Sequence, residues 1–534
     1  AKTFTSVSRI RTQQPWPLLS LHNKLKFPVA KRPILTCEES CNFEQELLGR
    51  DPEKEWVAMN KVADQLAHHI LLDFNEFRPM PRDPHILVLA GKGHNGGDAL
   101  LSAHRLLKSR PRGQVTILPI GNPDNFKPNT QKAFCSLAEE NKCRILQADA
   151  VPEKDNIDIS LDGILGMQFS PPLRAPLDKL IGTLNRLDNI GFRAAVDLPT
   201  GLGDQSIDEP LRADFTYATG IAKAPLFTKQ ALHWTGRIRY IDIGFFNQNL
   251  TQFENSKKIL TEDTLKPIRQ MRPSNCDKRS HGHLFCIGGS RHMPGALLLT
   301  VRAALRSGVG LVTAFAPESV ASQFAAVAPE AMWVPWPETP DGGLSLEGQH
   351  LLREKVSSAT ALATGPGIGV ERETQILLQE ILKETKLPTV IDADALQPEI
   401  IKSLGGAAIL TPHLGEMARL TGSHANDINT EIVREYSKIN NVTTLLKGPL
   451  SWITNGEQLH VSSFGSPVLA RGGSGDLLTG IVGGLLAQGH PPMEAADMAA
   501  VWHGQAAEHL ARNRGQTAVT TTLLLNYMHE PLRP

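Results

Sequence analysis

The stretch 85-HILVLAGKGHNGGDALLSAHRLLKS-109 contains three kinds of sequence in a row. Residues 86–90 are an unbroken apolar run, which is typical of a buried strand. A loop with four glycines follows, and after it Leu and Ala recur at the spacing of a helix face. A strand that passes through a glycine-rich loop into a helix is the unit of a parallel α/β sheet, which binds ligands at the carboxyl ends of its strands.

The same alternation extends over the rest of the chain. It predicts further strands at 114–121, 156–166, 192–201, 283–290, 310–317, 358–367, 389–396, 407–413 and 443–448. Helix-like spacing separates several of these runs, and the segment 493–511 reads as a long C-terminal helix. A chain of 534 residues is too long for one ordinary core, so we predict an α/β protein of two domains.

The predicted domains are 37–255 and 256–534, because residues 245–275 are polar and look irregular. Residues 1–36 contain seven Lys or Arg and no acid, with four prolines. We interpret them as a basic, poorly ordered arm; an Arg-rich transit peptide is the alternative.

Composition excludes several classes of function. The chain has 55 basic and 55 acidic residues, so it has no basic excess for nucleic acid or a membrane surface. No apolar stretch reaches transmembrane length, and we expect no membrane partner. The six cysteines form no CxxC pair and no zinc spacing, which predicts free thiols in a reducing compartment, the cytoplasm.

A second glycine-rich stretch, 471-RGGSGDLLTGIVGGLLAQG-489, carries a single acid. Gly472, Gly473 and Gly475 allow a ligand close to the backbone, and a helix that begins near Gly475 would point free N–H groups at an anion. Asp476 then lies in the first helical turn. The plain alternative is that this acid only favours the helix start.

Five other loops at predicted strand ends of the second half carry glycine or polar residues, namely 288-GGS, 365-GPGIG, 392-DADAL, 411-TPHLGE and 447-KGPLS. Together with 471-RGGSGD they resemble the ribokinase-like superfamily, an α/β/α fold, and more narrowly its ADP- or ATP-dependent NAD(P)H-hydrate dehydratases. The resemblance covers about residues 275–520, with the motifs in the family's order.

This resemblance implies a reaction. The substrate is NADH or NADPH that has gained a hydroxyl by addition of water to the nicotinamide ring. The family phosphorylates this hydroxyl and eliminates phosphate, and Asp476 would accept the hydroxyl proton. Magnesium is expected with ADP or ATP. The implied contacts to hydrated nucleotide are Ala296, Gly367 and His413, and those to the nucleotide phosphates are Lys447, Gly448, Pro449, Leu450, Ser451, Gly472, Gly473 and Gly475.

Each of these residues also has an ordinary structural interpretation. His413 fits a loop histidine, Lys447 a solvated charge and Gly367 a turn residue. Asp392 and Asp394 suggest a metal site, but a strand-end turn explains them better. Arg471 departs from the family's Thr or Ser and would add a phosphate contact or block one.

The first half resembles a different family. GKGHNGGDA at 91–99, DGILG at 162–166, VDLPTG at 196–201 and, more weakly, 214–226 match the motifs of NAD(P)H-hydrate epimerases, over about residues 45–245. The resemblance implies a Rossmann-like α/β sandwich that inverts the carbon bearing the added hydroxyl. The fusion of an epimerase to a dehydratase is a known arrangement.

Several residues then receive roles from the resemblance. Asp197 would be the acid/base residue. The family binds potassium beside its substrate, and Asn95, Asp162 and Thr200 supply the oxygen ligands that a hard cation prefers. The implied substrate contacts are Asn95, Gly96, Gly97, Asp98 and the loop 166–172, which begins at Gly166. Taken singly, Asp98 also fits a helix N-cap and Asp162 a turn acid.

The first half departs from its family at His94, Ala99, Lys92 and the segment GMQFS at 166–170. We therefore weigh a bifunctional repair enzyme against a dehydratase with a non-catalytic first half. Two further classes of protein stay open: a small-molecule kinase and a catalytically dead nucleotide-binding scaffold. Homo-oligomerisation is expected from the resemblance alone.

Overall fold

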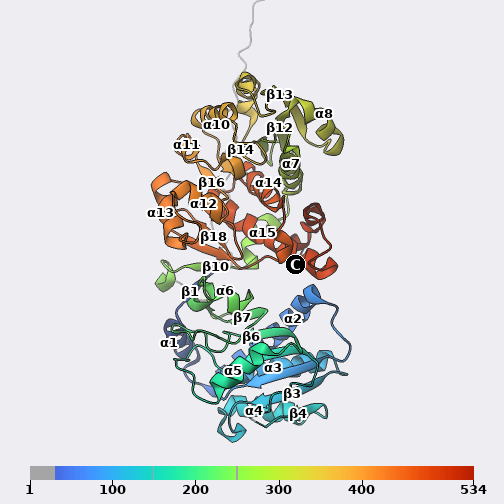
Figure 1. The fold of residues 1–534 in the computed structure, drawn as a ribbon, viewed down its shortest axis with the longest axis vertical. Coiled ribbons are helices and arrows are strands. Elements are labelled where there is room, and N and C mark those ends of the chain that lie inside the picture. The colour runs from blue at the N-terminus through green and yellow to red at the C-terminus, as the bar shows by residue number, and fades with distance from the viewer. Residues whose placement is uncertain (1–29, 148–149, 248–250, 534) are drawn as a thin grey trace, which may run out of the picture.

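The computed structural model describes residues 30–147, 150–247 and 251–533, and it folds into two α/β halves stacked along the long axis of the molecule (Figure 1). Each half is built around a mostly or wholly parallel sheet. The α/β fold class predicted from the sequence is confirmed. Residues 1–29 of the predicted basic arm lie outside the described residues.

The first half contains a seven-stranded parallel sheet in the order β4-β3-β2-β5-β6-β7-β9. Counted along the chain within this sheet, the order is 3-2-1-4-5-6-7, the winding of a Rossmann-like domain. Its strands are β2 (His85–Ala90), β3 (Gln114–Pro119), β4 (Cys143–Ile145), β5 (Ile157–Gly163), β6 (Ile190–Val196), β7 (Phe215–Thr219) and β9 (Arg237–Ile241).

Helices cover both faces of this sheet and bury its apolar side chains. Helices α2 (Pro52–Phe77), α3 (His94–Ser109) and α4 (Pro128–Ala138) pack on one face, and α5 (Leu177–Arg186) packs on the other. Two further helices belong to this half, α1 (Cys37–Leu48) and the short α6 (Leu232–Thr235). Because the order reverses between β2 and β5, the loops after these two strands diverge and leave room for a ligand.

The second half is organised around a twelve-stranded sheet, β13-β12-β11-β14-β15-β16-β17-β18-β19-β10-β1-β8. The seven strands from β13 to β17 are parallel and β18 runs antiparallel to its neighbours. These strands are β10 (Lys258–Leu260), β11 (His283–Ile287), β12 (Leu311–Pro317), β13 (Met332–Trp336), β14 (Ala361–Thr364), β15 (Thr389–Ile391), β16 (Ala408–Leu410), β17 (Thr443–Leu446), β18 (Ser451–Thr454) and β19 (Leu459–Ser462).

Helices again form a layer on each face. One face packs against α7 (Pro294–Arg306), α8 (Glu318–Val327), α14 (Ser474–Ala487) and α15 (Pro492–Arg514). The other packs against α9 (Gln349–Arg353), α10 (Arg372–Glu384), α11 (Pro398–Ile401), α12 (Leu414–Thr421) and α13 (Thr430–Asn440). The C-terminal helix predicted at 493–511 is α15.

Two short strands correct the sequence analysis. Residues 31–35 are β1 (Lys31–Leu35), a mostly buried strand, so the predicted disordered arm is wrong at these positions. The segment 245–275 is less irregular than predicted, because it contains β10 and a 3₁₀ helix at Glu262–Arg269. Both strands are held by partners far along the chain, which local sequence patterns do not reveal.

These strands extend the sheet of the second half into the first half, beside the separate seven-stranded sheet. β1 pairs antiparallel with β10 and parallel with β8 (Ala222–Lys223), and β10 pairs with β19. A shared apolar cluster lies beside them and contains residues of both halves: Ile34, Cys37, Leu198, Leu202, Ala218, Ala222, Leu226, Ala231, Ile238, Ile259, Leu450 and Val461. The rings of Phe227 and Trp452 meet across the same boundary, with centroids 6.4 Å apart.

A buried charge network forms the second link between the halves, where α2 packs against α15 (Figure 1). Asp73 on α2 accepts hydrogen bonds from Arg239 on β9 at 3.0 and 3.1 Å and from Arg512 on α15 at 2.9 Å. Arg239 also donates to Glu508 on α15 at 2.6 Å. Asp73, Arg239 and Glu508 are almost fully buried and Arg512 is largely buried, so each charge has a partner in the other half.

Two candidate active sites

The candidate site of the second half lies at the carboxyl ends of β11 and β14, where the strand order reverses. The loops that follow these strands meet. A Cβ on Gly367 would lie 2.3 Å from the carbonyl oxygen of Met293 and 3.0 Å from the Cβ of Ala296, and Gly367 has a φ of +65°. The two predicted substrate contacts Ala296 and Gly367 are therefore neighbours, and only glycine fits at position 367.

The glycine-rich loop 472–475 leads directly into α14, as predicted to within one residue. Gly473 is the N-cap and has a φ of +86°, a conformation that favours glycine. Asp476 follows in the first turn and is half-buried. Its backbone carbonyl accepts a 3.1 Å hydrogen bond from Thr300 of α7, which fixes the start of α14 against that helix.

Lys447, at the end of β17, is not a solvated charge. Its Nζ donates a 2.8 Å hydrogen bond to Oδ1 of Asp392, which follows β15, and lies 3.7 Å from Oε2 of Glu416. Thr479 of α14 donates to the other oxygen of Asp392 at 2.7 Å. Asp392 is thus part of the site: it pairs with Lys447 and Thr479 and does more than form the strand-end turn that the sequence suggested. Asp394 accepts a 3.0 Å hydrogen bond from the backbone of Gly369, and so connects its own loop to the loop after β14.

Electrostatics distinguish the two acids of this site. Burial raises the pKa of Asp476 to about 6, and the negative charge of Asp392 adds to the effect. Burial acts on Asp392 in the same direction, but Lys447 outweighs it and holds the pKa of Asp392 below its usual value. The site therefore combines one firmly ionised acid with one that can exchange a proton near neutral pH.

The other predicted contact residues of this half differ in exposure and in the elements that carry them. His413 caps α12, where its Nδ1 accepts hydrogen bonds from Gly415 and Glu416, and the rest of the ring is exposed. Gly448, Pro449 and Ser451 lie on the turn between β17 and β18, with Ser451 the first residue of β18. Leu450 is buried in the shared apolar cluster, so only its backbone can face a nucleotide.

The side chain of Arg471 turns from the glycine-rich loop 472–475 toward the segment that follows α15. Its guanidinium donates to the carbonyl oxygens of Gln516 and Thr517 at 3.0 and 2.7 Å. A few residues later Thr521 donates to the carbonyl of Gly472 at 2.8 Å. The arginine thus anchors a segment that in turn supports the loop.

The candidate site of the first half begins at the close approach of α3 to the end of β2. A Cβ on Gly96 would lie 2.0 Å from the carbonyl oxygen of Gly91, and one on Gly97 would lie 2.3 Å from the side chain of Met59. Asn95 donates a 2.7 Å hydrogen bond to the carbonyl of Leu165, beside Gly166. Helix α3 begins at His94 with Gly93 as its N-cap, so Asp98 is not the N-cap.

Asp162 and Thr200 form the floor of this site. The Thr200 hydroxyl donates to Asp162 at 2.6 Å, the Thr200 backbone donates to it at 2.7 Å, and Leu165 donates to the Thr200 hydroxyl at 3.2 Å. Asp162 is the penultimate residue of β5 and is buried. It also accepts a 3.2 Å hydrogen bond from the backbone of Ile164, so it supports the following turn as well as pairing with Thr200. Burial raises its pKa to about 6, opposed by hydrogen bonds from Thr200 and Ile164.

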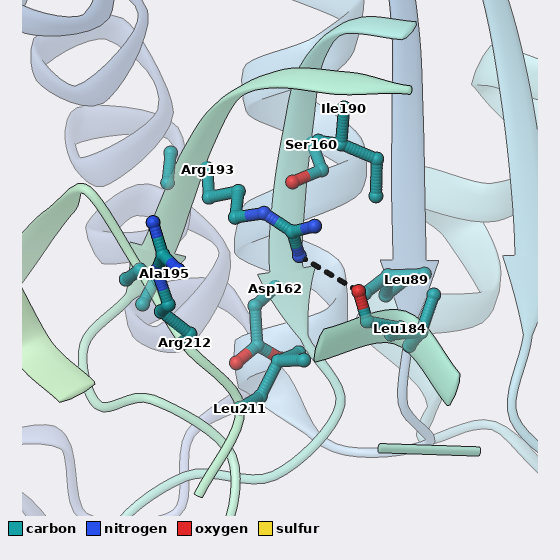
Figure 2. Close-up of a pocket in the computed structure, with 11 residues that line it drawn as sticks. Leu89, Ser160, Asp162, Leu184, Ile190, Arg193, Ala195, Leu211 and Arg212 are labelled. Atoms are coloured by element: carbon teal, nitrogen blue, oxygen red, sulfur yellow. Dashed lines mark hydrogen bonds between the residues drawn. The ribbon is translucent and has the colours of Figure 1, made fainter. Parts of the chain in front are cut away.

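A cavity of about 10 Å³ lies beside Asp162, between β5, β6 and α5 (Figure 2). Arg193 crosses it and donates a 3.0 Å hydrogen bond to the carbonyl of Leu184, as the dashed line shows. A space of this size holds about one water molecule. It is therefore a packing feature behind Asp162 and not a pocket for a nucleotide.

Asp197 follows β6 and has a φ of +67°, which an aspartate adopts more readily than most residues. Its Oδ1 contacts the ammonium of Lys223 and accepts hydrogen bonds from the backbone and hydroxyl of Thr219 at 3.3 and 3.2 Å. Asp98 is also buried, and burial together with the charge of Asp197 raises its pKa well above the usual value. Its Oδ1 has no hydrogen-bond partner among the described residues.

Sequence reasoning did not single out Lys223, Thr479 or Glu416. Lys223 stood inside the weakest motif, 214–226, and a lysine in a short apolar segment carries no signal of its burial. Glu416 was visible only as part of TPHLGE. Within the described residues no group of three or more His, Cys, Asp or Glu side chains is arranged to hold a metal ion, and no helix is long and apolar enough to cross a membrane.

Comparison with protein families separates the chain in the same way. A family described as NAD(P)H-hydrate dehydratase matches residues 284–530, and one described as YjeF-related protein N-terminus matches residues 56–224. The first match contains Asp476, Lys447 and Asp392, and the second contains Asp98, Asp197 and Lys223.

Relatives of similar length contain both halves. The bifunctional NAD(P)H-hydrate repair enzyme of Moorella thermoacetica is 32% identical over 469 residues, which cover 84% of this chain and 87% of the relative. The enzyme of the same name from Gloeobacter violaceus is 33% identical over 476 residues, which cover 85% and 89%.

Among solved structures, the ADP/ATP-dependent NAD(P)H-hydrate dehydratase of Bacillus subtilis, co-crystallised with ATP and Mg²⁺, matches with a TM-score of 0.44 and 27% identity, covering 51% of this chain and 96% of that one. The sequence relationship extends over both halves and over most of each bacterial relative. The chain belongs to the family of bifunctional NAD(P)H-hydrate repair enzymes.

Proposed function

We propose that this chain repairs hydrated NADH and NADPH in two steps. The first half interconverts the R and S forms of the hydrate, and the second half dehydrates the S form at the expense of ADP or ATP. The observation that supports the second step best is the position of Asp476, an acid of raised pKa in the first turn of a helix that follows a glycine-rich loop.

In the second half, Asp476 takes the proton of the substrate hydroxyl, and the hydroxyl oxygen attacks the terminal phosphorus of the nucleotide. The nucleotide leaves with one phosphate fewer. The carbon–oxygen bond then breaks to release phosphate, and the neighbouring ring carbon loses a proton, which restores the double bond of the dihydronicotinamide. Both parts of this sequence need stabilisation of negative charge.

The residues around Asp476 divide these tasks. The free N–H groups at the start of α14, with Gly472, Gly473 and Gly475, hold the transferring phosphate. The turn from Lys447 to Ser451 contacts the other phosphates through its backbone, because Lys447 already compensates Asp392. Mg²⁺ bound together with the nucleotide would supply further charge neutralisation. Ala296, Gly367 and His413 hold the hydrated nucleotide.

In the first half, Asp197 moves the proton that inversion of the hydroxyl-bearing carbon requires. Asn95, Gly96, Gly97, Asp98 and Gly166 surround the substrate. The close approach of Gly96 to Gly91 places the backbone of α3 at the floor of this site.

Asn95, Asp162 and Thr200 fit a potassium ion. Asp162 is a buried carboxylate whose hydrogen bonds come only from neutral groups, so its negative charge lacks a compensating cation among the described residues. Asn95 donates through Nδ2, which leaves its amide oxygen available as a ligand. A bound monovalent cation would neutralise Asp162 and attract the substrate phosphates.

Two further proposals concern the cellular compartment and the oligomeric state. The six cysteines are all free, which supports a reducing compartment such as the cytoplasm. Homo-oligomerisation is proposed from the family resemblance, and sedimentation of the purified protein tests it.

One assay tests both activities. The S form, with ADP or ATP, should regain the absorbance of the reduced nicotinamide when the protein is added. The R form, with an excess of a separate dehydratase, should regain it faster with the protein than without it. Phosphorylation of an unrelated alcohol in place of the first result would favour the small-molecule kinase. A missing second result would favour a non-catalytic first half.

A further inference from the structure

Lys223 is a fully buried lysine at the candidate site of the first half. Its side chain is 1% exposed, whereas that of Asp197 is 9% exposed. A buried ammonium without a carboxylate is strongly unfavourable, so the contact with Asp197 compensates the cost of burying this side chain. A second hydrogen bond, 3.0 Å long, joins its Nζ to the carbonyl oxygen of Thr219.

The hydrogen bonds to Asp197 are distributed unequally. Those that the described residues donate to its side chain, from Lys223 and from both groups of Thr219, all end on Oδ1. The oxygen Oδ2 remains available to a ligand. The carboxylate is therefore fixed at one oxygen by a cation, which leaves the other oxygen to act as a general base.

The backbone of Lys223 is also fixed in place, by strand pairing. Lys223 is the last residue of β8 and pairs in register with Leu35 of β1, which itself pairs with β10 of the larger sheet. Asp197 is held in its left-handed conformation by a backbone hydrogen bond of 2.8 Å to the carbonyl of Tyr217. Both partners of the ion pair thus come from rigid strand ends.

Other titratable groups face this pair from the neighbouring helices. Asp98 of α3 and Glu44 of α1 interact with both Lys223 and Asp197, and burial raises the pKa of Glu44 to about 7. Cys37 of α1 also faces them, and burial raises the pKa of its thiol to about 12, so it stays neutral. Lys223 is the one cation among these groups, and its loss would leave several buried acids without compensation.

We propose that Lys223 is a positioning residue of the epimerase reaction, which pairs with Asp197 and fixes the orientation of its carboxylate. Oδ2 then accepts the proton of the substrate hydroxyl while the bond between the hydroxyl-bearing carbon and the ring nitrogen breaks, so that an aldehyde forms and the electron pair of that bond passes to the nitrogen. The carboxylate returns the proton to the oxygen when the carbon–nitrogen bond re-forms on the opposite face of the carbon. This inference rests on the proposed function of the first half. Under this proposal the lysine contributes to the rate of epimerisation and does not merely stabilise the shared sheet.

The test compares three variants of the full chain with the wild type. K223M removes the charge and nearly keeps the length, K223R keeps the charge, and K229M is the matched control. Lys229 lies six residues further on and donates to the carbonyl of Asn426 at 2.9 Å. Each protein is assayed for epimerisation of the pure R form with a separate dehydratase in excess, and for dehydration of the S form with ADP or ATP.

In K223M, kcat of epimerisation should fall by about 100-fold or more, with KM within about threefold, because a misplaced or protonated base slows the reaction and not the binding. The pH below which epimerisation is lost should rise by at least about one unit, since a buried carboxylate without its cation takes up a proton more easily. K223R should be at least about tenfold faster than K223M, and K229M should match the wild type. Dehydration of the S form should be unchanged in all of them.

Epimerisation by K223M within about threefold of the wild type would overturn the proposal. So would equal losses in K223M and K223R that extend to dehydration, because such a result would show that the lysine only supports the shared sheet. Absence of epimerisation in the wild type itself would instead reject the proposed function of the first half.

Discussion

The ammonium of Lys447 donates a 2.8 Å hydrogen bond to Oδ1 of Asp392, and this contact joins the ends of two strands beneath the glycine-rich loop. Asp392 is almost fully buried, while the lysine side chain is 21% exposed. The positive charge of Lys447 is therefore neutralised by Asp392 before any phosphate binds, and the principal partner of this lysine is a residue of the protein.

Replacement of Lys447 by Met should destabilise the second half. The variant leaves the carboxylate of Asp392 buried without its cation, which costs about 3 kcal/mol in comparable buried pairs. Urea unfolding followed by circular dichroism should show a lower midpoint for the transition of this half. The double variant K447M/D392N should recover at least half of the loss, and a double variant no more stable than K447M would argue against the pair as the cause.

Replacement of Asp476 by Asn should abolish dehydration and leave nucleotide binding nearly intact. The amide keeps the size of the side chain but cannot take the hydroxyl proton, and a general base contributes about 10²- to 10⁴-fold. The rate with the S form and ADP or ATP gives the first result, and calorimetric titration with the nucleotide gives the second. A loss of less than tenfold would remove Asp476 from the role of base.

The pH profile of dehydration should report the same acid. Asp476 acts as a carboxylate, and burial and Asp392 raise its pKa to about 6. The wild-type rate should therefore fall as the pH drops below about 6, approaching a tenfold loss per pH unit. An ordinary aspartate would produce this fall about two units lower. The residual activity of D476N should lack the limb near pH 6, and its persistence there would assign the limb to another group.

Replacement of Arg471 by Thr should raise the KM for nucleotide several-fold while kcat stays within about twofold. The arginine contacts the carbonyls of Gln516 and Thr517 and so supports the phosphate loop indirectly. Steady-state kinetics with ADP and with ATP measure both constants. Unchanged KM values for both nucleotides would show that this support does not reach the loop, whereas a large drop in kcat would place the arginine in the chemistry.

Potassium should both stabilise the first half and speed epimerisation. If Asn95, Asp162 and Thr200 enclose the ion, Tm in potassium buffer should exceed Tm in tetramethylammonium buffer of equal ionic strength, by an amount that grows with concentration. The R form should also be converted faster. The variant D162N should show neither response, and equal behaviour of the wild type in both buffers would reject the ion site.

The sequence predicted the regular part of this molecule well, because fully buried strands and amphipathic helices have strong local periods. It placed the start of α14 to within one residue. It did not predict β4, β7, β8, β9, β13, β18 or β19. It also missed β1 and β10, which are short, carry Lys31 and Lys258, and exist because residues more than 200 positions away pair with them. The same reason hid Lys223, whose burial depends on β1.

The candidate sites followed a similar rule. Glycine-rich loops at strand ends were visible from the sequence and were placed together by the winding of the sheets. The partners that set the charge of each site were not visible, since Lys223 and Thr479 carry no local signal. Asp392 was visible as a residue, but its pairing with Lys447 spans 55 positions of the chain.

The strand β1 has a consequence for the order in which this protein is built on the ribosome. Residues 31–35 emerge before their neighbours, because β8 lies at 222–223 and β10 at 258–260. The other side of β10 pairs with β19, at 459–462. During translation β1 is unpaired until β8 and β10 have been synthesised. The edge of β10 opposite β1 then stays exposed until β19 has been synthesised. Completion of the sheet beside the first site is thus timed by synthesis of the second, and a stalled or truncated chain would present an open edge to chaperones and to other nascent chains.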